Sequence, residues 1–425
     1  MSSAIQQAPA PHWRQRAGRA LRNPLYRRYF LAQIPLVVGS WIHSIAIGWL
    51  MWRLSASPWL LGLLALCDLG PTFLLGPIAG TVSDRLDRRK LLVCTQAAFI
   101  VIVSLLGFLT LTDQVTVATV MLLTLSLGIV AAFDSPTRQA FVAELVGLDD
   151  LRNAIALNSM LFNAARLIGP AAGGAIVASF GEGWCFVLKA FAYVSMLVML
   201  MTIKAPSLIR RAREPFLTEM RRGLDFVRRR PAQARILILV GACSFTSVPY
   251  FSFLPVLADK MLGSDAAVAG LLMSLTGVGA VAAAILLTVF DRLSILRLYP
   301  GWSALLLGLT QIGIGLSSSL PLTAVLAVPM GFAILSQNLA SNSLLQQFTP
   351  PAYRGRVMAM YAMMMLGTVP FGSLIVGAIG DWLGMPFAFI AGGLLCAATA
   401  FVLVMLPERP DEATPGELQS SLQKT

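Results

Sequence analysis

Apolar segments long enough to cross a lipid bilayer recur along almost the whole chain. An α-helix needs about 20 apolar residues to span the hydrocarbon core, where only helices and closed barrels satisfy their own backbone hydrogen bonds. Hydrophobic residues make up 57% of the 425 residues and charged residues only 12%, about half the charged fraction of a soluble protein. The sequence therefore predicts an all-α, polytopic membrane protein with twelve spans, at 29–53, 59–82, 91–111, 115–133, 154–179, 185–203, 236–258, 267–290, 298–317, 320–345, 357–379 and 386–406.

These spans fall into two blocks of six that resemble each other. The second span ends in Asp84-Arg85 and the eighth in Asp291-Arg292, while Gly173 in the fifth has its counterpart at Gly372 in the eleventh. Two pseudo-symmetric six-helix bundles are typical of transporters that rock one half against the other around a central site. The predicted organisation is a basic tail at 1–28, a bundle at 29–203, a central loop at 204–235, a second bundle at 236–406 and a tail at 407–425.

The formal charge of +12 follows the topology of the spans. Arginine and lysine gather in the first tail, the loop after the second span and the central loop, so both termini are predicted to be cytoplasmic. This placement argues against a nucleic-acid partner and predicts a protein of the bacterial cytoplasmic (inner) membrane. Within the central loop, 214–230 forms a basic amphipathic pattern that we expect to lie on the anionic leaflet, with a regulatory or partner-binding helix as the alternative.

The residue inventory is poor in catalytic and metal-binding groups. The five cysteines stand singly inside apolar runs, and the chain has only two histidines. No Cys/His spacing predicts a metal site, and no P-loop, HExxH or GxSxG motif is present. We therefore predict no metal, no cofactor and no enzymatic activity.

A few charged or titratable residues fall inside the predicted spans. Asp68, Arg166 and His43 come near the midplane, where a charge costs at least about 2.5–3.5 kcal/mol. Asp68 is the predicted proton-coupling residue, and a static pair with Arg166 or His43 is the alternative. Arg166 is predicted either to bind substrate or to stabilise its helix, and His43 either to relay protons or to pack at a helix interface. Lys189 is placed near a membrane interface and is given no function.

The second bundle offers uncharged polar residues instead. A cluster on the tenth span repeats at helical spacing and predicts a hydrogen-bonding wall of the central cavity: Gln337, Asn338, Ser341 and Asn342.

Two motifs resemble signatures of the major facilitator superfamily. Residues 80–89 resemble G-x-x-x-D-R-x-G-R-R, with Asp87 where glycine is usual. The run RLIGPAAGG, 166–174, resembles the G-P-x-x-G-G signature of antiporters, and 141–174 with 346–360 is similar to exporters of the enterobactin-type siderophore and macrolide-efflux-like branch.

The resemblance implies the superfamily fold and roles for both motifs. Asp84 is expected to cap the eleventh helix, with Arg138 as a second partner, in a cytoplasmic gate; charges that only fix topology are the alternative. The gate residues are Gly80, Asp84, Arg85, Arg88, Arg89 and Arg138. The fifth-helix residues are expected to form a seam against the opposite half, with ordinary tight packing as the alternative: Gly169, Pro170, Gly173 and Gly174.

The leading functional hypothesis is a monomeric proton-coupled antiporter that exports a small amphipathic molecule, either a siderophore, another metabolite or a drug. Its partners are the substrate, protons and membrane lipid. A lipid or lysolipid flippase on the same fold is the alternative. A membrane sensor is disfavoured because no long receptor or catalytic domain is apparent.

Overall fold

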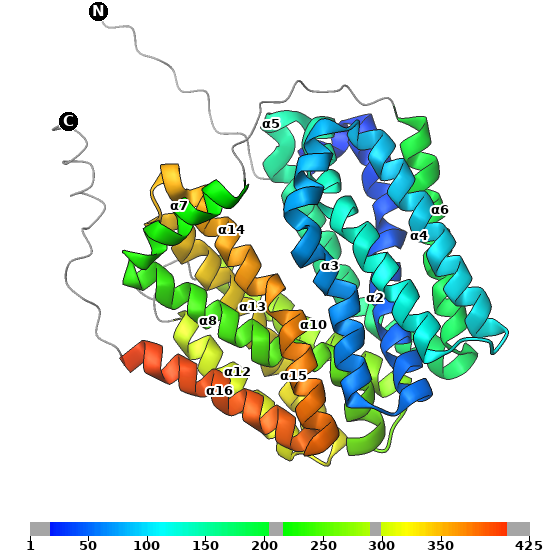
Figure 1. Ribbon diagram of the computed structural model, residues 1–425, viewed down its shortest axis with the longest axis vertical. Coiled ribbons are helices and arrows are strands. Elements are labelled where there is room, and N and C mark those ends of the chain that lie inside the picture. The colour runs from blue at the N-terminus through cyan, green and yellow to red at the C-terminus, as the bar shows by residue number, and fades with distance from the viewer. Residues whose placement is uncertain (1–17, 204–215, 290–298, 406–425) are drawn as a thin grey trace, which may run out of the picture.

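The computed structural model describes residues 18–203, 216–289 and 299–405. Throughout these ranges the regular elements are helical, as the sequence predicts (Figure 1). Four predicted features lie outside the described residues: most of the basic tail, the start of the central loop, the Asp291-Arg292 repeat and the tail after 405.

Capping side chains set the starts of the first helices. Asn23 and Ser57 each accept a hydrogen bond from a backbone N–H of the first turn, and Thr116 forms a capping box. The Asp87 carboxylate accepts from the Lys90 N–H at 3.0 Å, so the residue that departs from the signature glycine begins a helix. The elements are η1 (Arg19–Arg22), α2 (Pro24–Ser55), α3 (Pro58–Arg85), α4 (Arg88–Leu111), α5 (Val117–Phe180) and α6 (Glu182–Thr202).

The long helix α5 contains two membrane spans. Gly147 breaks it with φ 72° and ψ 174°, a conformation that favours glycine. The first span therefore runs from Val117 to Gly147, whereas the sequence predicted its end at residue 133. Asp134 and Arg138, which the sequence placed outside the spans, consequently lie inside a span.

The second bundle repeats this plan with more interruptions. Prolines and glycines divide its seventh and eleventh spans into shorter helical pieces. The elements are α7 (Phe216–Arg228), α8 (Pro231–Ser247), η2 (Val248–Phe253), α9 (Leu254–Val256), η3 (Leu257–Met261), α10 (Ala266–Val289), α12 (Tyr299–Leu316), α13 (Leu320–Phe348), α14 (Pro351–Gly367), α15 (Val369–Trp382) and α16 (Met385–Met405).

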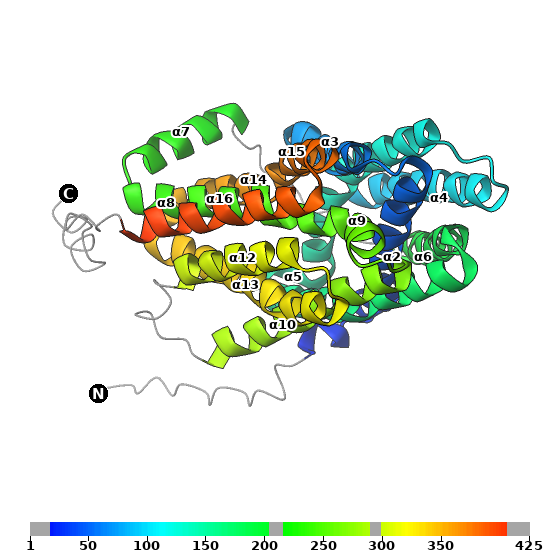
Figure 2. The same cartoon turned by 90° about the horizontal axis from the view of Figure 1, so that it is seen from below.

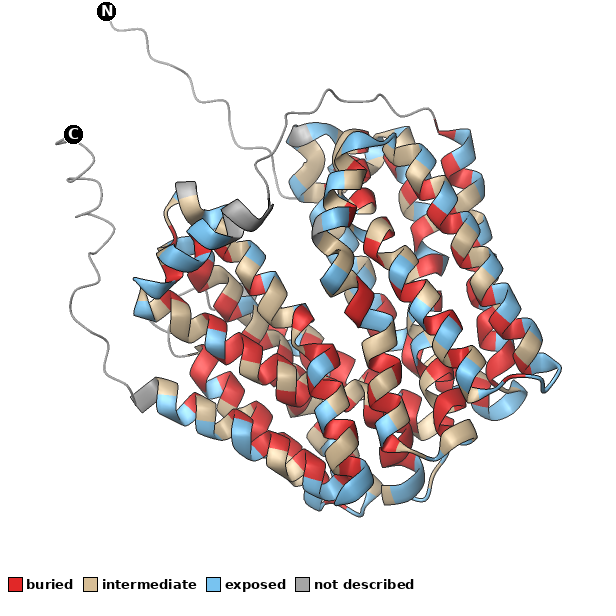
Figure 3. Cartoon of the chain, in the orientation of Figure 1, coloured by how far each residue is buried: buried red, intermediate tan, exposed pale blue. Residues whose placement is uncertain are grey.

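Eleven helical segments of the described chain are long and apolar enough to cross a membrane. The helix α12 is not among them, but it packs along α13 and α16 and occupies the predicted ninth span. The prediction of twelve membrane helices is consistent with this arrangement. Large apolar side chains such as Leu122, Phe191 and Trp302 are more than 60% exposed on the outer surface, as expected where lipid covers a protein (Figure 3).

The two bundles meet at one end and diverge toward the other (Figure 1). We call the end where α2 passes into α3 the Ser57 end, and the end where α3 passes into α4 the Asp84 end. Near the Ser57 end, the Trp52 Nε1 donates to the Asp259 carboxylate across the halves at 2.9 Å. Contact along α3 continues as far as Phe73, whose ring meets Phe371, but no atom lies within 4 Å of a Cβ built at Gly76.

The amphipathic helix α7 lies at the edge of the second bundle (Figure 2), where it contacts α14 and α8. Val227 is buried in a cluster with Leu237 and Val357, and Phe226 stacks on Tyr353 with ring centroids 4.4 Å apart. In the described part of this helix, α8 and α14 contact Phe226 and Val227, whereas Leu224 is exposed. Contact of the remaining apolar face with the leaflet stays a prediction.

Candidate functional site

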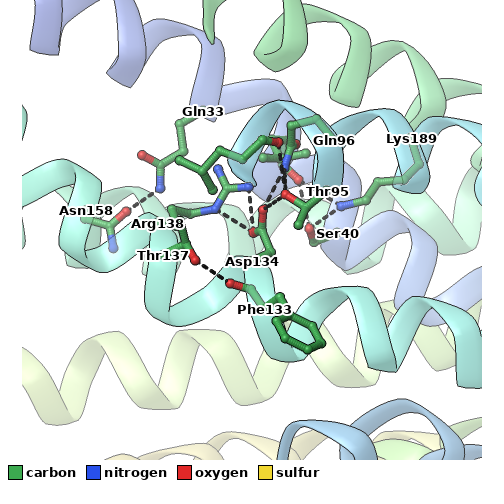
Figure 4. Close-up of polar contacts among 12 residues, drawn as sticks. Gln33, Ser40, Thr95, Gln96, Phe133, Asp134, Thr137, Arg138, Asn158 and Lys189 are labelled. Carbon is green, nitrogen blue, oxygen red and sulfur yellow. Dashed lines mark hydrogen bonds and ion pairs between the residues drawn. The ribbon is translucent and has the colours of Figure 1, made fainter. Parts of the chain in front are cut away.

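The centre of the first bundle holds a buried ion pair that the predicted spans missed. The Arg138 Nε and Nη2 donate to Asp134 Oδ2 at 2.9 and 2.8 Å from one turn further along α5. On α4, the Thr95 hydroxyl and the Gln96 amide donate to Asp134 Oδ1 at 2.8 and 2.7 Å (Figure 4). Asp134 thus accepts four hydrogen bonds and joins α4 to α5 inside the first bundle.

A second buried charge, Lys189 on α6, lies beside this ion pair (Figure 4). Its ammonium donates to the Leu36 carbonyl at 3.2 Å and to the Ser40 hydroxyl, both on α2, and stands 4.6 Å from the centroid of the Tyr193 ring. Lys189 is only 3% exposed, so the expectation that it reaches a membrane interface is wrong. It has no ion pair among the described residues and interacts electrostatically with both Asp68 and Asp134.

The structure does not bring Asp68, His43 and Arg166 into contact. Asp68 is exposed on α3 and makes no hydrogen bond or ion pair within the described residues. The His43 ring packs edge-on against Phe186 with centroids 5.3 Å apart, and its Nδ1 is buried without a hydrogen-bond partner in the described ranges. The static pairs that the sequence allowed for Asp68 are therefore absent from this part of the chain.

Arg166 on α5 lies where the two bundles meet. Its guanidinium carbon is 6.0 Å from the centroid of Trp41 on α2 and 5.3 Å from that of Phe251 on η2. The residue is 9% exposed, and its Nε has no hydrogen-bond partner in the part of the chain that the structure describes. Two aromatic rings from opposite halves thus surround this cation.

The predicted gate residues form contacts within the first bundle. Arg88 bonds the buried Glu144 carboxylate at 2.6 Å and Asp84 at 3.2 Å, while Arg89 donates to the carbonyls of Leu200 and Met201 at the end of α6. Arg138 contacts Asp134 and not Asp84, contrary to the expected pairing. Arg85 is exposed, and a Cβ built at Gly80 meets no atom within 4 Å.

The fifth-helix motif contacts both bundles. A Cβ at Gly169 would lie 2.6 Å from the Trp41 Cβ, and one at Gly173 would lie 2.9 Å from the Ile42 Cα, so these glycines allow α5 to approach α2. Gly174 faces the opposite half, where an added Cβ would collide with the Ala266 carbonyl of α10. The Pro170 carbonyl likewise meets Gly270 of α10.

The polar residues of α13 bond to each other and to their neighbours. Gln337 and Ser341 are buried, and the Gln337 amide donates to the Ser341 hydroxyl at 3.3 Å. Asn342 is half-buried and accepts from Gln346, and the Asn338 side-chain oxygen is buried without a partner. The predicted wall thus has two members, Gln337 and Ser341, that the protein itself encloses.

No three His, Cys, Asp or Glu side chains converge on a metal position within the described ranges. The buried charged residues of the described chain all lie in the first bundle: Asp134, Arg166, Glu182 and Lys189. Their arrangement suits charge and proton movement rather than bond-breaking chemistry, since no nucleophile lies beside a base there.

The fold and these buried charges define a multi-pass membrane transport protein of the major facilitator type. The chain belongs to the transmembrane secretion effector family of that superfamily, whose model matches residues 17–422. Members of this family are transporters of small molecules and not enzymes.

Individual relatives agree with this assignment. The staphyloferrin A transporter of Staphylococcus aureus is 24% identical over 385 residues, covering 88% of this chain and 95% of the relative. The enterobactin exporter EntS of Shigella boydii is 26% identical over 406 residues, covering 94% and 96%. Among solved structures, the nucleoside transporter NupG matches with TM-score 0.70 at 14% identity over 89% of this chain and 98% of that chain, which supports the fold alone.

Sequence inspection missed Asp134, Glu144 and the buried role of Lys189. A usable signal was present for the first, because Asp134 and Arg138 stand four residues apart, the spacing of an ion pair on one helical face. The burial of Lys189 had no comparable signal, since it depends on how α6 packs against α2.

Proposed function

We propose that this protein is a proton-driven exporter of a small amphipathic molecule in the bacterial inner membrane, acting as a monomer with both termini in the cytoplasm. The observation that carries the proposal is the contrast between two carboxylates of the first bundle. The Asp134 carboxylate accepts hydrogen bonds from four donor atoms of the protein, whereas Asp68 is exposed and makes no hydrogen bond or ion pair with a described residue. Asp68 is therefore the carboxylate that can exchange a proton without first breaking an ion pair.

Lys189 supports this role for Asp68 because its charge acts on both carboxylates from a buried position. Loading a proton on Asp68 removes a negative charge from this cluster and changes the electrostatic balance inside the first bundle. A change of that kind is the input that an alternating-access transporter needs to couple a proton to the rocking of its halves.

With the termini inside, the Asp84 end faces the cytoplasm and the described arrangement is open toward it. The hydrogen bond from Trp52 to Asp259 then belongs to a closed outer side. Among the described residues, the hydrogen bonds and ion pairs of the predicted gate stay within the first bundle, so these side chains are available to meet the second bundle when the inner side closes.

The relatives support a choice of substrate class. Proteins named for staphyloferrin A and enterobactin match nearly the full length of this chain, so a siderophore or a related metabolite is the proposed cargo, with drugs as a wider class. No feature of the described residues favours a lipid substrate over these.

Reconstituted proteoliposomes test this proposal with enterobactin, staphyloferrin A and ethidium as probes. For the transported probe, the wild type should accumulate it against its gradient when an opposing pH gradient is imposed, and a trapped pH dye should report proton counterflow. Asp68→Asn should abolish the accumulation driven by the pH gradient while leaving insertion intact.

Asp113→Asn is the matched control, because Asp113 is an exposed loop residue with φ 54°, a conformation that asparagine tolerates. This variant should transport like the wild type. Full accumulation by Asp68→Asn under the imposed gradient would show that Asp68 is not the coupling residue. Lipid scrambling without transport of any probe would point to a flippase instead.

A further inference from the structure

Arg166 is a buried cation without an anion. It makes no hydrogen bond or ion pair with any described residue, and it is 9% exposed. Two other cations enclosed by the first bundle are satisfied: Arg138 bonds Asp134, and Lys189 donates to Leu36 and Ser40. Removing a guanidinium from water costs several kcal/mol, and this cost is met only with good hydrogen bonds or a counter-charge.

The aromatic contacts of Arg166 do not supply that compensation by themselves. A cation–π contact contributes about 0.5–2 kcal/mol, and its distances here, 6.0 Å to Trp41 and 5.3 Å to Phe251, are at the long end of the useful range. None of these contacts gives the guanidinium N–H groups an acceptor. A ligand that carries an oxygen anion would give them one.

A second unpartnered donor lies beside the first. The indole Nε1 of Trp41 is also buried, with no acceptor among the described residues. Two such donors on neighbouring side chains, with no acceptor between them, favour a ligand with two acceptor oxygens, as a carboxylate has. The rings add a flat apolar surface, because Trp41 packs against Phe162 with centroids 5.2 Å apart and Phe162 is 48% exposed.

Close helix packing positions the parts of the chain that carry both donors. Gly169 lets the Trp41 Cβ approach α5, since a Cβ added there would lie 2.6 Å from it. On the other side, a Cβ at Gly277 of α10 would lie 3.2 Å from the Arg166 carbonyl, so α10 holds the backbone of Arg166. The fifth-helix motif thus places one donor from α5 and one from α2 against a ring from the opposite bundle.

We infer that Arg166, Trp41 and Phe251 form an anion-binding site for the carboxylate of a substrate that has a flat unsaturated group next to it. This inference rests on the proposed export function and adds the substrate class. Because Trp41 belongs to the first bundle and Phe251 to the second, a ligand held there contacts both halves at once. Binding therefore acts on the surface along which the halves move.

The test measures equilibrium binding to the purified full chain in detergent, at one pH and without a membrane gradient. The probes are 2-naphthoate, which has both the carboxylate and the rings, 2-naphthamide, which keeps the shape without the charge, and cyclohexanecarboxylate, which keeps the charge without the aromatic ring. The wild type should bind 2-naphthoate roughly 10-fold or more tightly than either of the other probes, as expected for a charge-assisted hydrogen bond.

Arg166→Gln should abolish the preference for 2-naphthoate over 2-naphthamide, and Arg166→Lys should keep only part of it. Trp41→Phe retains a ring but removes the Nε1 donor and should weaken 2-naphthoate binding several-fold. The matched control is Lys260→Gln, which removes another cation over an aromatic ring, 5.0 Å from the centroid of Trp52 and away from the site. Its preference should equal that of the wild type.

A purely structural Arg166 predicts a different pattern. In that case Arg166→Gln lowers the thermal stability of the ligand-free protein, but the folded fraction keeps the wild-type preference for the carboxylate. That result, or a wild type with no preference for 2-naphthoate over 2-naphthamide, would overturn the inference. Neither result changes the outcome of the proton-coupled transport assay with Asp68→Asn. The carboxylate site at Arg166 and the export function can therefore be refuted independently of each other.

Discussion

Replacement of Asp134 by asparagine should destabilise the protein strongly, although the two side chains have the same shape. The asparagine oxygen can still accept from Thr95 and Gln96, but its amide nitrogen takes the place of Oδ2 and faces the Arg138 donors. Two charge-assisted hydrogen bonds, at 2.9 and 2.8 Å, are lost. Arg138 then remains as an unpaired buried cation.

The expected loss is about 3–5 kcal/mol in the free energy of unfolding, the range for removing one partner of a buried ion pair. The Asp134 and Arg138 side chains are 10% and 17% exposed, which places this pair well outside the regime of surface ion pairs, worth about 0–1 kcal/mol. Unfolding in mixed detergent micelles, followed by tryptophan fluorescence, gives the free energy. Asp113→Asn in the exposed loop is the control and should be within about 0.5 kcal/mol of the wild type.

A double substitution tests whether the cost comes from the unpaired charge. Adding Arg138→Met to Asp134→Asn removes the stranded guanidinium and should recover about 2 kcal/mol. The reasoning is refuted if Asp134→Asn is no worse than Asp113→Asn, or if the double variant is less stable than Asp134→Asn alone.

Three further predictions follow from particular contacts. Arg88→Gln should lower the free energy of unfolding by about 3 kcal/mol in the same assay, because it removes the 2.6 Å charge-assisted bond to the buried Glu144 carboxylate. Trp52→Phe should remove the hydrogen bond to Asp259 and shift the protein away from the state closed at the Ser57 end, as measured by spin-label distances across that end. Gly174→Val should abolish the close packing of α5 on α10 and with it folding, measured by size-exclusion chromatography of a fluorescent fusion.

Each of these has an outcome that contradicts it. Arg88→Gln with wild-type stability would mean that Glu144 is satisfied by other groups. Unchanged distances in Trp52→Phe would show that the hydrogen bond to Asp259 has no part in holding that end closed. For Gly174→Val, Gly76→Val is the matched control, since a Cβ at Gly76 meets no atom within 4 Å and this variant should fold normally.

Periodicity and composition predicted the fold because the bilayer imposes a simple rule on sequence. Each span must be apolar for about 20 residues, so the helix count can be read without knowing any tertiary contact. The rule fails at the ends of spans, where polar residues continue a helix beyond the bilayer core or inside a protein interior. For this reason the fourth span was predicted to end at residue 133, and the ion pair of Asp134 with Arg138 was missed.

The contact partners of the titratable residues inside the spans could not be predicted from the depth of these residues in the membrane. His43, Asp68 and Arg166 are predicted at a similar depth in the membrane, yet their surroundings in the described chain differ. His43 packs against Phe186, and Arg166 lies between two aromatic rings. Asp68 makes no hydrogen bond or ion pair with a described residue. Depth gives only the position of a residue along the membrane normal. To predict a contact, one must also know how each helix is rotated about its own axis and which helices lie next to it. Arg138 illustrates the same limit, because a carboxylate on its own helix lies nearer than Asp84.

The sequence by itself determined the class of this protein: a helical membrane transporter of the major facilitator type, with its two bundles and its fifth-helix glycine motif. Only the tertiary structure decided which charges are paired. A buried charge changes the free energy of the fold according to the donors and acceptors within a few ångströms. Those neighbours come from α2, α4, α6 and η2, helices far apart in the chain, and packing alone brings them to Asp134, Lys189 and Arg166.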